Sequence, residues 1–180
     1  MKTAAVALTA LALLAGCANS RQASSQSGDR IVKAASPAQQ QALLGRVKAL
    51  EGKWQQRNED GSTELATVYQ VSSGGNVVRE VMFPGASHEM TNVYHMDGPD
   101  LVMTHYCAVG NQPRMRAKGV NGNRIDFVFD SATNHTSPQQ SVMHEMSLEI
   151  KDNNTIVQHW RSRKDGKPLP ETKFELTRMK

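Results

Sequence analysis

Beyond residue 53 the chain alternates between apolar and polar side chains with a period of two. Between residues 141 and 151, every second side chain from Val142 to Ile150 lies on one face, whereas Glu145 and Glu149 lie on the other. This period is typical of an antiparallel sheet that buries one face. The pattern therefore predicts a mainly β protein.

Turn-forming residues divide this region into short segments. Groups rich in Gly, Asn, Asp and Pro recur, such as Asp97-Gly98-Pro99. They delimit ten predicted strands, at 53–59, 63–72, 76–83, 88–96, 100–107, 114–120, 123–130, 141–151, 154–163 and 170–179. Because tight turns join strands that follow each other in sequence, we expect a single antiparallel up-and-down β-barrel that closes on itself. Two packed sheets of a sandwich are the alternative.

One short helix is predicted ahead of the strands. Ser36 is a favourable N-cap, and Pro37 suits the first helical position. Gly52 is expected to end the helix. An apolar stripe along it is formed by Leu43, Leu44, Val47 and Leu50.

The beginning of the chain has the composition of an export signal. Lys2 precedes an uncharged, mostly apolar run from Thr3 to Ala15, which is too short to cross a bilayer as a helix because about 20 apolar residues are needed. The end of the run, Leu14-Ala15-Gly16-Cys17, resembles a bacterial lipobox. This resemblance implies cleavage before Cys17 and acylation of its thiol. An ordinary signal peptide with an incidental cysteine is the alternative.

Cleavage before Cys17 would divide the chain into a removed segment and a mature part, so we distinguish three regions. We expect a lipoprotein signal peptide at 1–16, an acylated N-terminus with a flexible tether at 17–36, and the helix and barrel at 37–180. Each buried methylene of the acyl chains contributes about 0.8 kcal/mol, so two or three chains would anchor the protein to a membrane. Ala18 favours the outer membrane, with the protein facing the periplasm, in a Gram-negative cell.

The segment Gly52-Lys53-Trp54 resembles the Gly-x-Trp motif of lipocalins, and it likewise follows a short helix at the start of the first strand. In that family the Trp closes the base of the barrel and an Arg near the last strand packs over its ring, which makes Arg178 the corresponding residue. The second lipocalin motif is absent, and ten strands exceed the eight of lipocalins, so the resemblance is to the wider calycin group. The segments Tyr94-His95, Leu101–Cys107 and Gly110–Met115 resemble a set of uncharacterised bacterial lipocalin-like exported proteins, and this resemblance covers about residues 40–180. The resemblance implies a barrel with a ligand cavity and no particular reaction.

A small apolar or amphipathic molecule is the predicted ligand. Met103, His105 and Met146 lie at positions expected to face the barrel interior, where flexible methionines would line a cavity. Packing as ordinary core is the alternative for these residues. Arg116, by similarity to the interior arginines of fatty-acid-binding relatives, would hold a ligand carboxylate. A solvent-facing position on the exterior is the alternative for Arg116.

A metal or haem site is the second functional hypothesis. His105 and Cys107 are two residues apart and share a face, and His95 lies on the adjacent predicted strand. With Met103 they offer imidazole, thiol and thioether ligands, which suit copper or haem. Core packing again explains the same residues, and no other cofactor is predicted.

Composition and charge narrow the function classes. The chain has 180 residues, two cysteines and a formal net charge of +4, from 21 Lys and Arg against 17 Asp and Glu. This mild basic excess does not indicate nucleic-acid binding, and two cysteines exclude a disulfide-stapled scaffold. The sequence lacks a Gly-rich phosphate loop, a Gly-x-Ser-x-Gly elbow and a Cys-x-x-Cys pair. We therefore expect a non-enzymatic binding module on a membrane, with a ligand-free structural envelope lipoprotein as the alternative.

Overall fold

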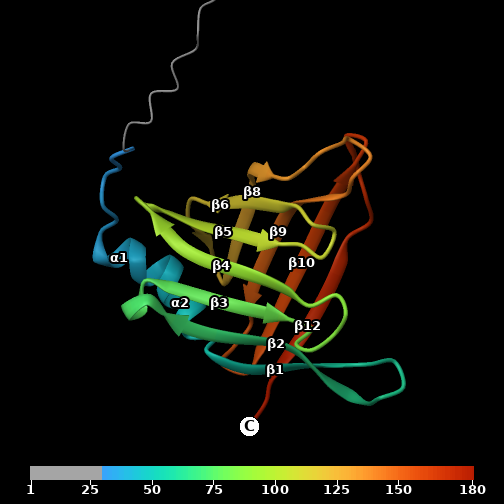
Figure 1. Ribbon diagram of the computed structural model, residues 1–180. Coiled ribbons are helices and arrows are strands. Elements are labelled where there is room, and N and C mark those ends of the chain that lie inside the picture. Colours follow the sequence, from blue (N-terminus) through green and yellow to red (C-terminus); the bar gives the residue numbers. More distant parts are fainter. Residues whose placement is uncertain (1–29) are drawn as a thin grey trace, which may run out of the picture. The chain divides into compact units, whose positions relative to one another are not determined.

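Ten antiparallel strands close into a barrel in the computed structural model, which describes residues 30–180 (Figure 1). The compact unit spans Val32–Lys180. The barrel strands are β1 (Gly52–Arg57), β2 (Thr63–Ser72), β3 (Val77–Met82), β4 (Met90–Asp97), β5 (Asp100–Tyr106), β6 (Gln112–Ala117), β8 (Arg124–Thr133), β9 (Val142–Ile150), β10 (Thr155–Lys164) and β12 (Thr172–Arg178).

Each barrel strand pairs with the strands that precede and follow it, and β12 pairs with β1 to close the barrel. Trp54 lies opposite Arg178 across this closing pair. Two short strands, β7 (Val120–Asn121) and β11 (Lys167–Pro168), extend the edges of β8 and β10. The predicted ten-stranded up-and-down barrel is confirmed, and the sandwich alternative is wrong.

The helical segment before the barrel comprises α1 (Pro37–Gln40), the π-helical turn η1 (Gln41–Gly45) and α2 (Arg46–Lys48). Ser36 caps it as expected, because its Oγ accepts a hydrogen bond from the Gln39 amide at 3.2 Å, while the Gln39 side chain accepts one from the Ser36 amide at 2.9 Å. The apolar stripe of this segment packs on the barrel core through Leu43, Leu44, Val47 and Leu50.

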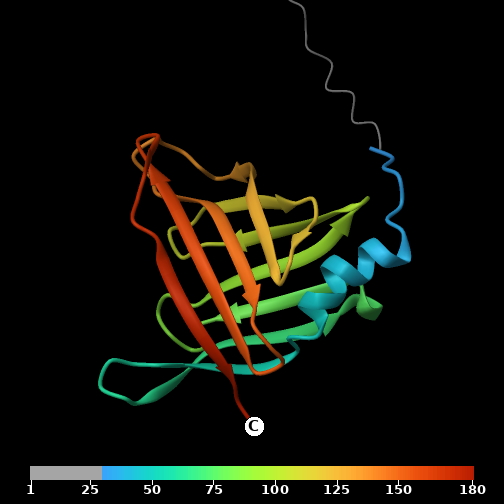
Figure 2. The ribbon, with the colours of Figure 1, turned by 180° about the vertical axis from the view of Figure 1, so that it is seen from behind.

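The strands define two ends of the barrel. At the helix end, short turns join the strands beside α1, η1 and α2; a 3-10 turn, η2 (Ser73–Gly75), is among them. At the opposite end, which we call the rim end, longer connections run over 82–90, 133–142 and 164–172. Figure 2 shows the orange and red strands forming one wall, with the green and yellow strands behind them. The rim end therefore carries the loops on which a binding site is most easily built.

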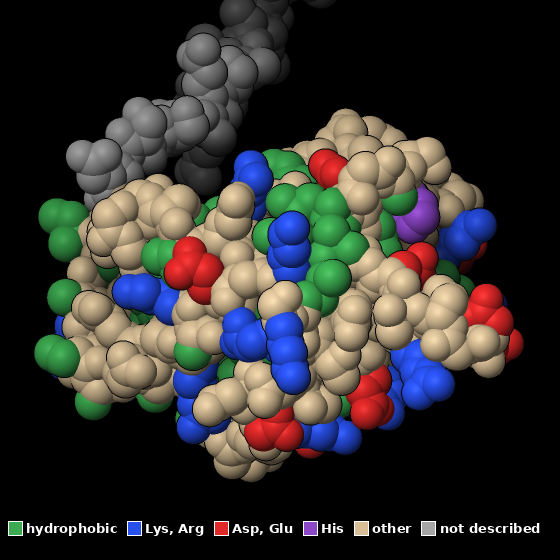
Figure 3. Space-filling view, turned by 90° about the horizontal axis from the view of Figure 1, so that it is seen from below, with side chains coloured by type: hydrophobic (Ala, Val, Ile, Leu, Met, Phe, Trp, Pro, Cys, Tyr) green, Lys and Arg blue, Asp and Glu red, His purple; other side chains and the backbone are tan. Residues whose placement is uncertain are grey.

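The outer surface carries charges of both signs. On the face drawn in Figure 3, Lys and Arg side chains lie beside a hydrophobic patch near the middle, with Asp and Glu nearer the edges. On this face the basic side chains do not form the continuous stripe that is typical of nucleic-acid-binding proteins. Within residues 30–180, no helix has the length and apolar content needed to cross a bilayer.

Candidate functional site

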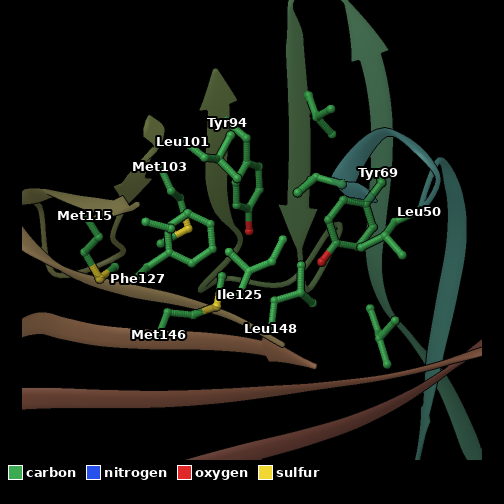
Figure 4. Close-up of a cluster of buried hydrophobic side chains, with 14 of the residues drawn as sticks. Leu50, Tyr69, Tyr94, Leu101, Met103, Met115, Ile125, Phe127, Met146 and Leu148 are labelled. Atoms are coloured by element: carbon green, nitrogen blue, oxygen red, sulfur yellow. The ribbon is translucent and has the colours of Figure 1, made fainter. Parts of the chain in front are cut away.

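The interior of the barrel is filled by large side chains. Met103, Met115 and Met146 are fully buried, as are Leu101 and Phe127. Figure 4 shows these side chains converging on one another from opposite walls, with Tyr69 and Tyr94 pointing their hydroxyl groups into the same space. The centre of the barrel is therefore packed as a core.

A buried polar cluster is embedded in this apolar core, and the carboxyl group of Glu80 lies at its centre. Tyr94 donates its hydroxyl to Glu80 Oε2 at 2.6 Å, and Asn92 Nδ2 donates to the same oxygen at 2.7 Å. Gln158 Nε2 donates to Glu80 Oε1 at 2.6 Å, and the Thr67 hydroxyl lies 3.1 Å from that oxygen. All five side chains are nearly inaccessible to water. Three donors from two other strands, β4 and β10, thus satisfy the carboxyl group, while the single Thr67 hydroxyl proton also has Val81 O as an acceptor at 2.9 Å.

The cluster extends outward from Gln158. Its Nε2 also donates to the Tyr69 hydroxyl at 2.7 Å, and its Oε1 accepts from Trp160 Nε1 at 2.9 Å. Burial raises the pKa of both Tyr69 and Tyr94 well above the usual tyrosine value, and repulsion from Glu80 adds to this effect. Both phenols therefore stay protonated and act as hydrogen-bond donors or acceptors, not as acid–base groups.

His105 joins the cluster at its edge. Its Nδ1 lies 2.7 Å from Asn92 Oδ1, and its ring contacts that of Trp160 at 5.0 Å between centroids. Its Nε2 is buried and has no hydrogen-bond partner among residues 30–180. Burial lowers the pKa of His105 from 6.5 to about 4, so the ring is neutral at pH 7.

This neutral histidine predicts acid-sensitive stability. The folded pKa lies below the unfolded value, so the unfolded chain binds more protons, and the free energy of unfolding falls as pH drops from about 6.5 towards 4. His105 alone is expected to account for a loss of about 3 kcal/mol between pH 7 and pH 4. Urea unfolding at several pH values measures the free energy of unfolding and gives its slope against pH. His105→Gln should reduce this slope, whereas His135→Gln, at an exposed loop position, should keep it. An unchanged slope in His105→Gln would contradict the assignment.

A pocket of about 330 Å³ lies at the rim end, and we call it the rim pocket. It is bounded by the end of β8, the start of β9, the end of β10 and the 133–142 connection. Phe129 and His144 stack in its wall with ring centroids 4.8 Å apart and planes inclined by 14°. Its lining also includes Pro138, Val142, Arg163 and Lys164.

Local irregularities shape this pocket. The register between β9 and β10 shifts between Arg161 and Ser162, so that His144 is an extra residue on β9. The 133–142 connection is held to the hairpin after β10 by the Asp165 amide, which donates to Pro138 O at 2.7 Å. These features separate the strand ends and leave space between them.

The interior candidates differ in where they lie. Met103, Met146 and His105 are buried within the barrel, at the inward positions that the alternation predicts. The expectation that Arg116 lines the interior is corrected: it lies between Met115 and Ala117, which are both fully buried, so its own side chain points outward.

Arg116 is engaged in ion pairs on the outer surface. Its guanidinium lies 2.8 Å from Asp97 Oδ2 and 3.2 Å from Asp100 Oδ2. These two carboxylates already pair with the guanidinium to which a ligand carboxylate would have to bind. Arg79 on β3 is likewise on the outer surface, where it is exposed and donates to Gln70 Oε1 at 2.9 Å.

The three residues of the metal hypothesis do not converge. His105 points into the barrel, whereas His95 neighbours the buried Tyr94 on β4 and so points outward, where its Nδ1 lies 3.1 Å from Met96 O. Cys107 is half-buried just beyond β5. Among residues 30–180, no group of three or more His, Cys, Asp and Glu side chains is placed to hold a metal ion. Copper or haem binding through a single one of these residues stays a prediction.

The base of the barrel has the arrangement that the lipocalin resemblance implies. Trp54 is fully buried, its Nε1 donates to Leu50 O at 2.8 Å, and the Arg178 guanidinium carbon lies 4.4 Å from its ring centroid. Arg178 also donates to Ala49 O at 2.9 Å, which caps the end of the helical segment. Gly52 has φ of 125°, and a Cβ there would lie 3.3 Å from Arg178 Nη1, so glycine suits this position.

Sequence reasoning missed the polar cluster. In β3 the inward positions are Val78, Glu80 and Met82, and the acidic residue between two apolar ones was the available signal. It also missed the rim pocket, because the bulge that places His144 beside Phe129 leaves no mark in the local pattern. Cys17 and the predicted signal peptide lie outside the described residues.

The chain matches no protein-family model, and no curated protein matches it.

Proposed function

We propose that this protein is an exported lipoprotein, acylated at Cys17, that holds a small amphipathic molecule in the rim pocket of its barrel without catalysing a reaction. The observation that carries the proposal is the rim pocket itself, a concave site of about 330 Å³. A volume near the lower end of the range for ligand pockets suits a small molecule.

The packing of the barrel supports this location over the interior. Interior side chains such as Met103 and Met146 are fully buried and contact other core residues, so a ligand there would have to displace them. The rim pocket needs no such displacement. Its apolar lining combines the half-buried Phe129, the exposed Pro138 and the buried Val142.

A neutral aromatic probe tests the proposal. N-phenyl-1-naphthylamine should bind the full chain and gain fluorescence. Val142→Ser removes apolar surface from the pocket and should weaken binding about fivefold. Val128→Ser is the matched control, because Val128 is 56% exposed and does not line the pocket. Absence of binding, or equal binding by all three proteins, would contradict the proposal.

Membrane attachment is tested separately. Cys17→Ala removes the thiol that the lipobox resemblance assigns to acylation, and the protein should then leave the membrane fraction of its host. Fractionation followed by immunodetection measures this, with Cys107→Ala as the matched control that should stay membrane-bound. Retention of Cys17→Ala on membranes would contradict lipid anchoring.

A further inference from the structure

The rim pocket combines its apolar wall with basic side chains that have no acidic partner within the described part of the chain. Arg163 and Lys164, at the end of β10, form no ion pair with another residue in the range 30–180. Two residues earlier, Arg161 is paired with Glu145 at 3.4 Å and with Glu171 at 2.9 Å. Two carboxylates thus neutralise Arg161 on the neighbouring outer surface, whereas Arg163 in the pocket has no such ion pair within residues 30–180.

His144 brings a second polar group to the same place. Burial lowers the pKa of His144, the charge of Arg163 lowers it further, and Glu145 acts in the opposite direction. Arg163 pairs with Val142 across β9 and β10, two residues from His144, and both side chains line the pocket, so a ligand bound there lies beside both. An anion placed between them would be attracted by the guanidinium and would favour the protonated imidazole.

The other titratable groups at the pocket are already accounted for by the structure. His135 Nε2 lies 3.2 Å from Gln140 O within the 133–142 connection. Asp165 contributes one acidic side chain against the two basic side chains of Arg163 and Lys164. The formal charge of the pocket is therefore positive at neutral pH.

We infer that the rim pocket takes an amphipathic anion, with its acidic group beside Arg163 and His144 and its aromatic or aliphatic part against Phe129 and Val142. This inference rests on the proposed function, and it adds the chemical class of the ligand. A planar guanidinium suits carboxylate, sulfonate and phosphate groups, since it donates two parallel hydrogen bonds to them. The stacked ring of Phe129 suits a flat or extended apolar body.

Two probes with nearly the same aromatic body separate charge from apolar contact. 8-Anilinonaphthalene-1-sulfonate carries a sulfonate, and N-phenyl-1-naphthylamine has the same ring system without it. Both are titrated into the full chain made by cell-free synthesis, so that no acyl chain or detergent competes. Arg163→Gln should weaken binding of the sulfonate probe about tenfold and leave the neutral probe unchanged. Lys151→Gln, which removes the same charge from an exposed turn at the helix end, should change neither.

The pH dependence provides an independent readout. The sulfonate stays ionised throughout, so its binding should tighten as pH falls below about 6.5 and His144 gains a proton. His144→Gln should remove this dependence, and His88→Gln, at an exposed position that does not line the pocket, should retain it. The imidazole signals in NMR spectra should also show the pKa of His144 rising when the sulfonate probe binds.

The outcomes distinguish the inference from the proposed function. If both probes bind equally well and Arg163→Gln affects neither, the anion inference is wrong, while binding of a small apolar molecule stands. If neither probe binds, both are wrong. Selective loss of sulfonate binding in Arg163→Gln, with intact neutral-probe binding, supports both.

Discussion

Glu80→Ala is expected to lower the free energy of unfolding by about 3–5 kcal/mol. The substitution leaves the Tyr94 hydroxyl, Asn92 Nδ2 and one Gln158 donor without their acceptor in a site that water does not reach. It also opens a cavity in a close-packed core. A domain of this size is stable by about 5–15 kcal/mol, so the loss is a large share of the total stability at 25 °C. Urea denaturation followed by circular dichroism measures the change.

Two controls separate the buried cluster from a general effect of removing a carboxyl group. Glu80→Gln keeps one acceptor oxygen and the side-chain volume, so it should cost less than Glu80→Ala. Glu175→Ala removes an exposed side chain from β12 and should change stability by under about 0.5 kcal/mol. If Glu80→Ala is as stable as Glu175→Ala, the cluster does not have the energetic importance assigned to it.

Trp54→Ala is the second substitution with a large expected effect, a loss of about 3–5 kcal/mol. It removes a fully buried side chain at the base of the barrel, its hydrogen bond to Leu50 O and the surface on which Arg178 packs. Since Arg178 also caps the helical segment and lies opposite Trp54 in the closing pair β1–β12, the helix end should loosen as a unit. Hydrogen exchange combined with urea unfolding measures both effects.

Trp54→Phe is the matched control for this position. It keeps an aromatic ring under Arg178 and loses the indole N–H, so it should cost about 1–2 kcal/mol, well below the alanine variant. Faster hydrogen exchange should be concentrated at β1, β12 and α2 in Trp54→Ala. Equal losses of stability in the two variants, or hydrogen exchange that increases evenly over the barrel, would show that Trp54 and Arg178 do not hold the helix end together.

The strands and the helix were predictable because local signals agree with the final packing. Turn residues such as Asp97-Gly98-Pro99 sit where the barrel turns, and the alternation from Val142 to Ile150 reports a buried face except near the bulge. Ser36 and Pro37 start the helical segment as their chemistry requires. Up-and-down connectivity needs only neighbouring strands to pair, so short-range patterns carry most of the information.

The candidate site was less predictable because its residues meet through long-range contacts. Gln158 and Glu80 are separated by 78 residues, and the sequence around either residue does not indicate that the two side chains are in contact. Arg116 shows a related difficulty, since its residue type suggested a ligand role while the alternation with Met115 and Ala117 placed it outside. Residue type was a weaker guide here than the face on which the residue lies.

Stability and binding are assigned to different parts of the barrel. The packed interior and its buried polar cluster stabilise the strands, and the loops at the rim end provide the concave surface. Core substitutions are therefore expected to change unfolding, whereas Val142 and Arg163 are expected to change binding. Our claim is therefore that the interior maintains the fold and the rim end binds the ligand.

NMR mapping of the neutral probe on the full chain tests that claim most directly. N-phenyl-1-naphthylamine should shift the methyl signals of Val142 and the amide signal of Gly166 at the rim pocket. The methyl signals of the buried Leu101, Met103 and Leu148 should stay unchanged. Shifts confined to those interior methyl groups would move the ligand site into the barrel, and the absence of any shift would contradict a binding function at the rim.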